Sequence, residues 1–315
     1  MAATSEPDFA VDLFAFWNEN AWDVPDIAEL ARLGRAEPRA LWDRLLGMLR
    51  RSGVGAIEVT FAPFDWRTAI AAYGGVAGLT SALDDHGLRI CGGYLPQLED
   101  EAALAPERRR DLLAAVDEYA DFLAETGATA LIGSAPPRAT PGGGPARFVD
   151  LAEARRLAVP FHEVGRAARR AGIRFGLHTE SHSAMWLERD IDLFMLATDP
   201  CYVGLCPDAA HIVLGGGDPV AVASRHAGRL VSAHWKDAVS AMPWDVPDGE
   251  DVHARHREYF RVPGRGVVDW PRWAAELAGA GLTTPVLLEI DASPDPVADI
   301  SAAIDHLTPV LASLA

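Results

Sequence analysis

The chain has 315 residues, of which 49% are hydrophobic and 23% charged, and its formal net charge is −17. This length does not require two domains, because α/β barrels reach it as a single unit. The acidic charge argues against a nucleic-acid partner, which would need a clustered basic face. Neither a membrane-length apolar run nor a basic leader followed by an apolar segment is present. Three cysteines without metal-type spacing fit reduced thiols, so we expect a soluble, cytoplasmic protein.

Eight short apolar runs recur along the chain, and each is followed by a longer segment with helical periodicity or composition. The expected strands are 9–15, 55–60, 88–93, 129–133, 173–179, 202–207, 229–234 and 285–290. The expected helices are 39–52, 67–86, 104–126, 147–171, 187–198, 218–227, 270–280 and 295–313. This alternation predicts a parallel sheet, either closed as a barrel or open and doubly wound.

The first strand is not followed by a GxGxxG pattern, which disfavours an open dinucleotide-binding sheet. We therefore predict one (β/α)₈ TIM barrel over residues 9–315, with 1–8 as a disordered tail. Two long connectors, 134–146 and 238–269, follow strand C-terminal ends, where barrel active sites lie. We expect them to act as lids or to contact substrate.

Ionisable side chains end four consecutive expected strands. The fifth ends with His178 and Glu180, the sixth with Asp208, the seventh with His234 and the eighth with Glu289. In a barrel these ends meet at one mouth. A single such residue more often caps a helix or forms an ion pair, but four on adjacent strands indicate a site. Carboxylates with an imidazole suit one divalent ion, with Mn²⁺ preferred and Mg²⁺, Co²⁺ or Zn²⁺ as alternatives.

Two further residues are expected near this mouth. His211 follows Asp208 by one helical turn, close enough to support the metal shell or to contact substrate. Lys236 lies two positions past His234 and would face the mouth as a catalytic group. The alternative is a surface lysine paired with Asp237.

Three residues are candidates for substrate contact. Trp186 and Trp244 lie on segments that follow strands and could stack on a sugar ring, although packing explains most aromatic residues. Arg261, just before a Pro-Gly-Arg-Gly turn, could contact a substrate oxygen or a phosphate. The sequence contains no phosphate-cradling motif, so it leaves open whether the substrate is phosphorylated.

These motifs resemble the xylose-isomerase-like barrels, which include sugar-phosphate isomerases and epimerases, inosose dehydratase, dehydroshikimate dehydratase and endonuclease IV. The resemblance covers residues 9–310, and its motifs are Asp208-x-x-His211, His234-x-Lys236-Asp237, Val262-Pro263-Gly264-x-Gly266 and Leu288-Glu289. It implies a small-molecule carbohydrate substrate. It also implies a metal held by Glu, Asp, His and Glu from strands five to eight, here Glu180, Asp208, His234 and Glu289.

The fifth strand departs from the family pattern, because His178 stands where many members have a metal-bound glutamate. Either His178 binds the metal and Glu180 is the base, or the roles are reversed. We prefer Glu180 as ligand and His178 as base, since an imidazole with a near-neutral pKa suits proton transfer. The His-x-Glu pattern is also similar to the large subunit of bacterial C-glycoside deglycosidases. The protein is thus predicted to assemble in one of two ways, as a homo-oligomer or with a small accessory subunit.

The chemistry implied by the resemblance is removal of the proton α to a carbonyl of a sugar or keto-sugar. Return of the proton gives an isomerase or epimerase, with Glu289 as a second acid/base. Loss of a leaving group gives a lyase: a dehydratase, or an enzyme that eliminates the aglycone of a 3-keto-glycoside. Two other functions are possible: endonuclease IV-like repair, which the negative charge disfavours, and an inactive binding subunit, which the four strand-end residues disfavour.

Overall fold

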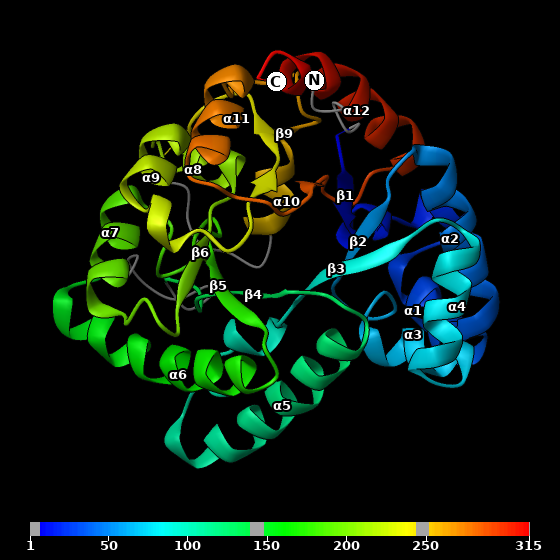
Figure 1. The fold of residues 1–315 in the computed structure, drawn as a ribbon, viewed down its shortest axis with the longest axis horizontal. Helices are drawn as coiled ribbons and strands as arrows, with labels where there is room; N and C mark the ends of the chain where they lie inside the picture. Colours follow the sequence, from blue (N-terminus) through cyan, green and yellow to red (C-terminus); the bar gives the residue numbers. More distant parts are fainter. Residues whose placement is uncertain (1–6, 139–147, 244–251, 315) are drawn as a thin grey trace, which may run out of the picture.

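The computed structural model describes residues 7–138, 148–243 and 252–314. Eight parallel strands form a nearly closed barrel with helices around it (Figure 1). They are β1 (Phe9–Asp12), β2 (Ala56–Val59), β3 (Arg89–Tyr94), β4 (Ala130–Ser134), β5 (Arg174–His178), β6 (Gly204–Cys206), β7 (His234–Trp235) and β10 (Val286–Leu288). The hydrogen-bonded order is β6-β5-β4-β3-β2-β1-β10-β7. Isolated parallel bridges between Leu205 and Leu230 and between Asp208 and His234 link β6 to β7. The predicted barrel is therefore confirmed.

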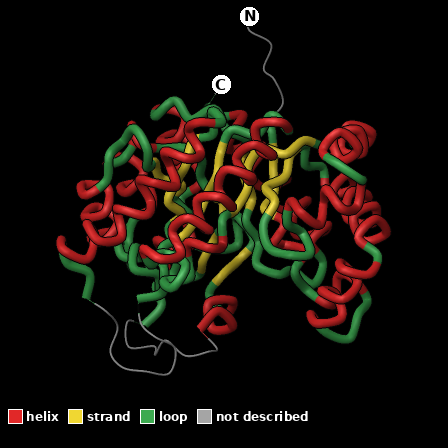
Figure 2. The backbone as a smooth tube through the Cα atoms, turned by 90° about the horizontal axis from the view of Figure 1, so that it is seen from below, coloured by secondary structure: helices red, strands yellow, loops and turns green. Residues whose placement is uncertain are grey.

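The helices lie outside the strands, as Figure 2 shows at right angles to the first view. They are α1 (Ile27–Ala36), α2 (Pro38–Ser52), α3 (Trp66–Tyr73), α4 (Val76–Asp85), α5 (Arg109–Glu125), α6 (Leu151–Arg170), α7 (Glu188–Ala197), α8 (Ala209–Leu214), α9 (Pro219–Arg225), α10 (Val252–Arg257), α11 (Trp270–Gly279) and α12 (Pro296–Ala312). Between the strands and these helices lies one extensive apolar core. Within the described ranges, no helix combines the length and apolar character needed to cross a membrane.

Several expected elements differ from the structure, and for two of them the local reason is clear. The segment expected as one helix over 67–86 is divided into α3 and α4, because Gly74 takes a left-handed φ of 72° and ends α3. The first strand ends at Asp12 rather than at residue 15. There the Asp12 carboxylate accepts a hydrogen bond from the Phe14 amide at 2.6 Å and starts the 3₁₀ helix η1 (Leu13–Phe16).

The long connector after β7 contains a two-stranded antiparallel sheet, β8 (Asp237–Ala238) with β9 (Phe260–Arg261). The buried Asp237 carboxylate organises the turn that follows β9, because it accepts hydrogen bonds from the amides of Gly264 (2.9 Å), Gly266 (3.0 Å) and Val268 (3.1 Å). A Cβ at Gly266 would lie 2.2 Å from Asp237 Oδ1, so this close approach requires glycine. The other long connector, 134–146, lies mostly outside the described residues.

Candidate metal and substrate site

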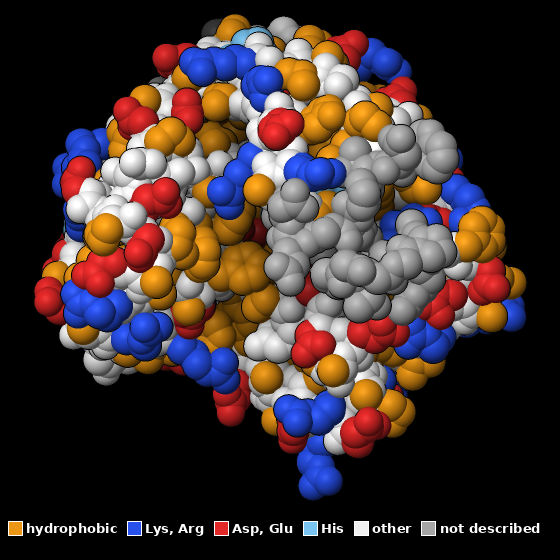
Figure 3. Space-filling model, turned by 180° about the vertical axis from the view of Figure 1, so that it is seen from behind, with side chains coloured by type: hydrophobic (Ala, Val, Ile, Leu, Met, Phe, Trp, Pro, Cys, Tyr) orange, Lys and Arg blue, Asp and Glu red, His pale blue; other side chains and the backbone are white. Residues whose placement is uncertain are grey.

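A cavity of about 350 Å³ opens where the strands end, and it faces the viewer of Figure 3 as a hollow bordered by hydrophobic, Lys and Arg side chains. Its walls are rich in ionisable and aromatic groups. The lining residues are Asp12, Phe14, Trp17, Thr60, Phe61, Tyr94, Glu99, His178, Glu180, His211, His234, Lys236, His256, Arg257, Phe260, Glu289 and Asp291. The structure thus brings candidates from the fifth, seventh and eighth strands to one cavity.

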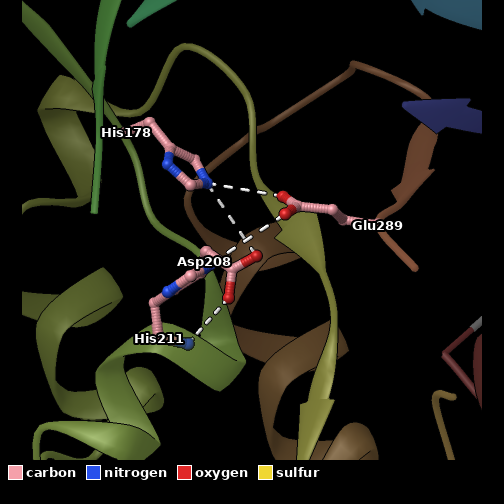
Figure 4. Close-up of side chains that lie close together, drawn as sticks. All are labelled: His178, Asp208, His211 and Glu289. Atoms are coloured by element: carbon pink, nitrogen blue, oxygen red, sulfur yellow. Dashed lines mark hydrogen bonds and ion pairs between the residues drawn. The ribbon is translucent and has the colours of Figure 1, made fainter. Parts of the chain in front are cut away.

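Four buried residues at this mouth, His178, Asp208, His211 and Glu289, place one potential ligand atom each within 4.8 Å of one another. Figure 4 shows His178, Asp208 and Glu289 pointing toward a common centre. His178 Nε2 lies 3.5 Å from Glu289 Oε2 and 3.9 Å from Asp208 Oδ2. His178 Nε2 and Asp208 Oδ2 are buried and have no hydrogen-bond partner among the described residues. Such groups are costly to bury unless something binds them, so this cluster could hold a metal ion.

The local fold explains why Asp208 has one free oxygen. Asp208 is the N-cap of α8, and its Oδ1 accepts a hydrogen bond from the His211 amide at 2.8 Å. Its own amide donates to Thr179 Oγ1 at 2.9 Å. The carboxylate is therefore fixed in orientation, and Oδ2 is left facing the cluster.

A chain of hydrogen bonds from β5 to β3 fixes the proton on His178. Its Nδ1 lies 3.1 Å from Ser134 Oγ, Ser134 Oγ lies 2.6 Å from the Tyr94 hydroxyl, and that hydroxyl contacts the Glu99 carboxylate. Because Glu99 can only accept, Tyr94 donates to Glu99, Ser134 donates to Tyr94, and His178 donates to Ser134 from Nδ1. In the neutral ring, the Nε2 lone pair is then directed at Asp208 and Glu289.

A second buried imidazole, His234, has its proton fixed by β2. Its Nε2 lies 3.0 Å from Glu58 Oε2, and the fully buried Glu58 carboxylate accepts a hydrogen bond from Nε2–H. Its Nδ1 contacts Glu289 Oε2. When Nε2 carries the proton, two lone pairs meet at that contact, and only a proton or a cation can hold them together.

His211 differs from these two imidazoles. Its Nδ1 accepts the Ser181 amide at 3.0 Å, and its Nε2 lies 3.0 Å from the Lys236 ammonium, which can only donate. Burial and the nearby Lys236 ammonium hold the pKa of His211 well below its usual value, which keeps the ring neutral. Both ring nitrogens of His211 therefore face hydrogen-bond donors already, the Ser181 amide and the Lys236 ammonium.

Glu180 lies outside the four-residue cluster, and its side chain is 21% exposed to the cavity. Its Oε2 is 3.5 Å from His178 Nδ1, and its Oε1 is 3.4 Å from His211 Nδ1. Burial raises the pKa of Glu180 to about 8. The carboxylate is thus next to the cluster, on the side that faces the cavity.

Lys236 is buried, and the alternative of a surface lysine paired with Asp237 is wrong. Its Nζ lies 2.7 Å from Glu289 Oε1 and 2.6 Å from Asp291 Oδ1. The ammonium also lies 3.9 Å from the centre of the Phe260 ring. Asp237 does not pair with it, because the Asp237 carboxylate is occupied by the turn that follows β9.

Of the described residues predicted to contact substrate, only one lines the main cavity. His211 lines the cavity, whereas Trp186 does not: its indole is buried, stacks on His182 at 4.2 Å and donates to the His211 carbonyl at 3.0 Å. The expectation that Trp186 stacks on substrate is not met, because its ring packs in an apolar cluster. Arg261 lines a neighbouring cavity instead. Trp244 lies outside the described residues.

The sequence analysis overlooked carboxylates from the first two strands. Asp12 ends β1 and lines the cavity, while Glu58 lies within β2 and holds His234. Both carboxylates lie in otherwise apolar strands, Phe9–Asp12 and Ala56–Val59. A carboxylate in or directly after an apolar run is the same signal that identified Glu289 as a candidate.

An aromatic wall, which we define as Phe14, Trp17, Phe61 and Tyr94, forms part of the cavity lining. Ring centres are 6.1 Å apart between Phe14 and Trp17, 5.8 Å between Phe14 and Phe61, and 5.5 Å between Phe61 and Tyr94. Continuous ring faces of this kind accept a flat or apolar part of a ligand.

The sequence pattern of the xylose isomerase-like TIM barrel family matches residues 46–310. The chain belongs to this family. An inosose dehydratase from Lacticaseibacillus casei is 28% identical over 148 residues, or 44% of this chain and 47% of that protein. The match thus spans about half the length of this curated relative.

Two solved structures show that the family fold extends over nearly the whole chain. A xylose isomerase-like TIM barrel protein from Mycobacterium smegmatis, in complex with magnesium, is 19% identical, covers 99% of both chains and has a TM-score of 0.68. D-psicose 3-epimerase from Clostridium cellulolyticum H10, with D-tagatose, is 15% identical, covers 96% of this chain and 99% of its own, and has a TM-score of 0.63.

Proposed function

We propose that this chain is a metal-dependent enzyme that removes the proton α to a carbonyl of a sugar or keto-sugar and then isomerises, epimerises or eliminates. The observation that carries this proposal is the pair of unpartnered buried atoms, His178 Nε2 and Asp208 Oδ2, beside a cavity-facing carboxylate, Glu180. An inosose dehydratase and a D-psicose 3-epimerase among the similar proteins support the substrate class.

We infer that His178, Asp208 and Glu289 bind the ion, with His234 as the fourth ligand. This assignment exchanges the roles that the sequence favoured on the fifth strand. The physical reason is the proton position: in their neutral forms both His178 and His234 direct a lone pair at Glu289, whereas both His211 nitrogens already face donors, the Ser181 amide and the Lys236 ammonium. A bound divalent ion would supply Lewis-acid polarisation of a substrate carbonyl.

Glu180 then becomes the proton acceptor. Its carboxylate faces the cavity, and its raised pKa brings its proton affinity closer to that of a carbon acid. Lys236 lines the same cavity, where its ammonium can donate a hydrogen bond to substrate oxygen as negative charge develops. Glu289, already in contact with Lys236 and His234, is better placed as a ligand than as a second base.

Elimination of an aglycone from a 3-keto-glycoside is the second candidate. The aromatic wall favours it, because four adjoining rings offer more apolar surface than a lone sugar ring needs. Both candidates share the first step, removal of the α proton. They differ in whether that proton returns to carbon or a leaving group departs.

The test is to incubate the Mn²⁺-loaded protein in D₂O with keto-sugars and 3-keto-glycosides and to follow them by NMR. We expect deuterium at the α carbon, or release of the aglycone. Glu180→Gln should slow either reaction by roughly 10²- to 10⁴-fold, the usual contribution of a general base, while the protein still binds metal. A fully metal-loaded wild-type protein that exchanges no α proton in any of these compounds would overturn the proposal.

A further inference from the structure

A second cavity, of about 200 Å³, adjoins the first. Lys236, Arg257, Phe260 and Asp291 line both, so the two spaces meet at these side chains. The remaining walls of the second cavity come from β9 and the turn after it, from the loop after β10, and from the first turn of α12. They are Arg261, Val262, Arg265, Ile290, Ser293, Pro294 and Asp299.

The second cavity concentrates positive charge in a chain whose net charge is −17. Arg257, Arg261 and Arg265 line it together with Lys236. Arg257 has no hydrogen-bond or ion-pair partner in the part of the chain that the structure describes, and its side chain is exposed. Arg261 donates from Nη1 to the carbonyls of Glu258 (2.9 Å) and Phe260 (2.7 Å). These two hydrogen bonds do not involve its Nε or Nη2.

The two carboxylates in these walls already have partners. Asp291 lies 2.6 Å from Lys236 Nζ. Asp299 accepts the Ser293 hydroxyl at 2.7 Å, and its distance to Arg265 is 4.0 Å, the outer limit of an ion pair, with the Arg265 side chain 62% exposed. The arginines therefore have hydrogen-bonding capacity that the cavity's own acids do not take up.

The backbone that carries two of these arginines is fixed in advance. Arg261 lies on β9, and Arg265 lies in the turn whose amides the Asp237 carboxylate binds. Pre-organised guanidinium groups bind planar or tetrahedral anions through paired N–H donors. In many barrels, moreover, the loops after the seventh and eighth strands form the anion site.

We propose that the second cavity binds an anionic group of the substrate, a phosphate or a carboxylate, while the reacting carbons lie in the first cavity. This inference rests on the proposed function for the identity of the ligand as a substrate. The binding of an anion by Arg257, Arg261 and Arg265 does not depend on any reaction.

The experiment titrates the protein with inorganic phosphate by calorimetry at low ionic strength. The protein is metal-free, so that phosphate cannot bind a metal ion instead of the arginines. The variant is Arg257→Ala with Arg265→Ala; both side chains are solvent-exposed, so the fold should persist, and an unchanged Tm verifies this. The matched control is Arg108→Ala with Arg110→Ala, which removes the same charge near the start of α5. We expect saturable binding that weakens about ten- to hundred-fold in the first variant and stays unchanged in the control.

A second arm separates the two anion classes by comparing D-glucuronate with D-glucose in the same titration. Glucuronate binding that depends on the two arginines identifies a carboxylate subsite, and phosphate binding alone identifies a phosphate subsite. If neither anion binds saturably, or if both double variants weaken binding equally, the inference is wrong. Anion binding without α-proton exchange would support the anion site and overturn only the proposed function. Exchange without anion binding would support the proposed function and overturn only the anion site.

Discussion

The role of His178 depends on which ring nitrogen carries the proton. Ser134, Tyr94 and Glu99 form a chain that ends on a carboxylate and draws the proton to Nδ1. The Nε2 lone pair is then buried without a partner in the described structure, 3.5 Å from Glu289. Such an atom suits a metal ligand better than a base that must meet substrate, since a base needs access to the cavity.

Replacing His178 with alanine should therefore remove the metal. We expect His178→Ala to lower Mn²⁺ affinity by at least about 100-fold, since even partners outside the ligand shell contribute 10- to 100-fold. Metal content after gel filtration, together with calorimetry, measures this. Glu180→Gln is the matched control and should retain the ion. The reverse pattern, with metal kept by His178→Ala and lost by Glu180→Gln, would restore the assignment that the sequence favoured.

Sequence patterns located this site but not the chemistry of each residue. The convergence of His178, Asp208 and Glu289 could be predicted, because strand ends in a barrel share one mouth. The tautomer of His178 could not, since it is set by Ser134 on the neighbouring strand. Glu58 could have been predicted from the same kind of pattern. It lies inside an apolar strand, and Glu289 directly follows one.

At the scale of elements, the turn after β9 depends on the Asp237 carboxylate. Gly266 packs so closely that an added Cβ would lie 2.2 Å from Asp237 Oδ1, and part of that contact would be with backbone, which cannot swing away. The turn carries Arg265 and adjoins the second cavity, so its geometry bears on both stability and binding.

Gly266→Ala should therefore destabilise the barrel. We expect its Tm to fall by roughly 3 °C, which corresponds to about 2 kcal/mol for a chain of this length. Gly279→Ala at the end of α11 is the control, because an added Cβ there meets nothing within 4 Å. Differential scanning calorimetry compares the two. Equal Tm values for both variants would show that the Asp237 contacts do not hold this turn.

Element boundaries were harder to predict than element types. Long helices such as α6 and α12 carry their own periodicity and lie close to the expected ranges. The short α8 was missed because six residues give no periodic signal, although its N-cap, Asp208, is visible in the sequence. The seventh strand was expected over 229–234 but spans only His234–Trp235, because strand pairing across the β6–β7 gap is limited to isolated bridges.

At the scale of the whole molecule, the barrel was predictable because each apolar run has a helical segment after it, and a parallel sheet buried on both faces needs such runs. The overall charge was less informative. A net charge of −17 describes the average surface, yet three arginines gather at one cavity beside the mouth. Total charge argues against a nucleic-acid groove but says nothing about a small anion subsite.

Metal binding should also couple the stability of the whole barrel to pH. In the metal-free protein burial alone would lower the pKa of His178, but Asp208 and Glu289 raise it to about 10. The ring is then protonated at neutral pH, and an ion can bind only by displacing that proton. Affinity should therefore rise with pH up to that pKa, by about tenfold per unit for each proton displaced.

The measurement is the rise in Tm on adding Mn²⁺ at pH 6 and at pH 8.5. Because an ion that binds only the folded state stabilises it by about 2.7 kcal/mol at 100 times its Kd, a tighter site at pH 8.5 should give the larger shift. Calorimetry in two buffers with different ionisation enthalpies should show proton release at pH 6. A Tm shift independent of pH, without proton release, would mean that the ion displaces no proton from the cluster, and the assignment of His178 as a ligand that exchanges its proton for the metal would fail.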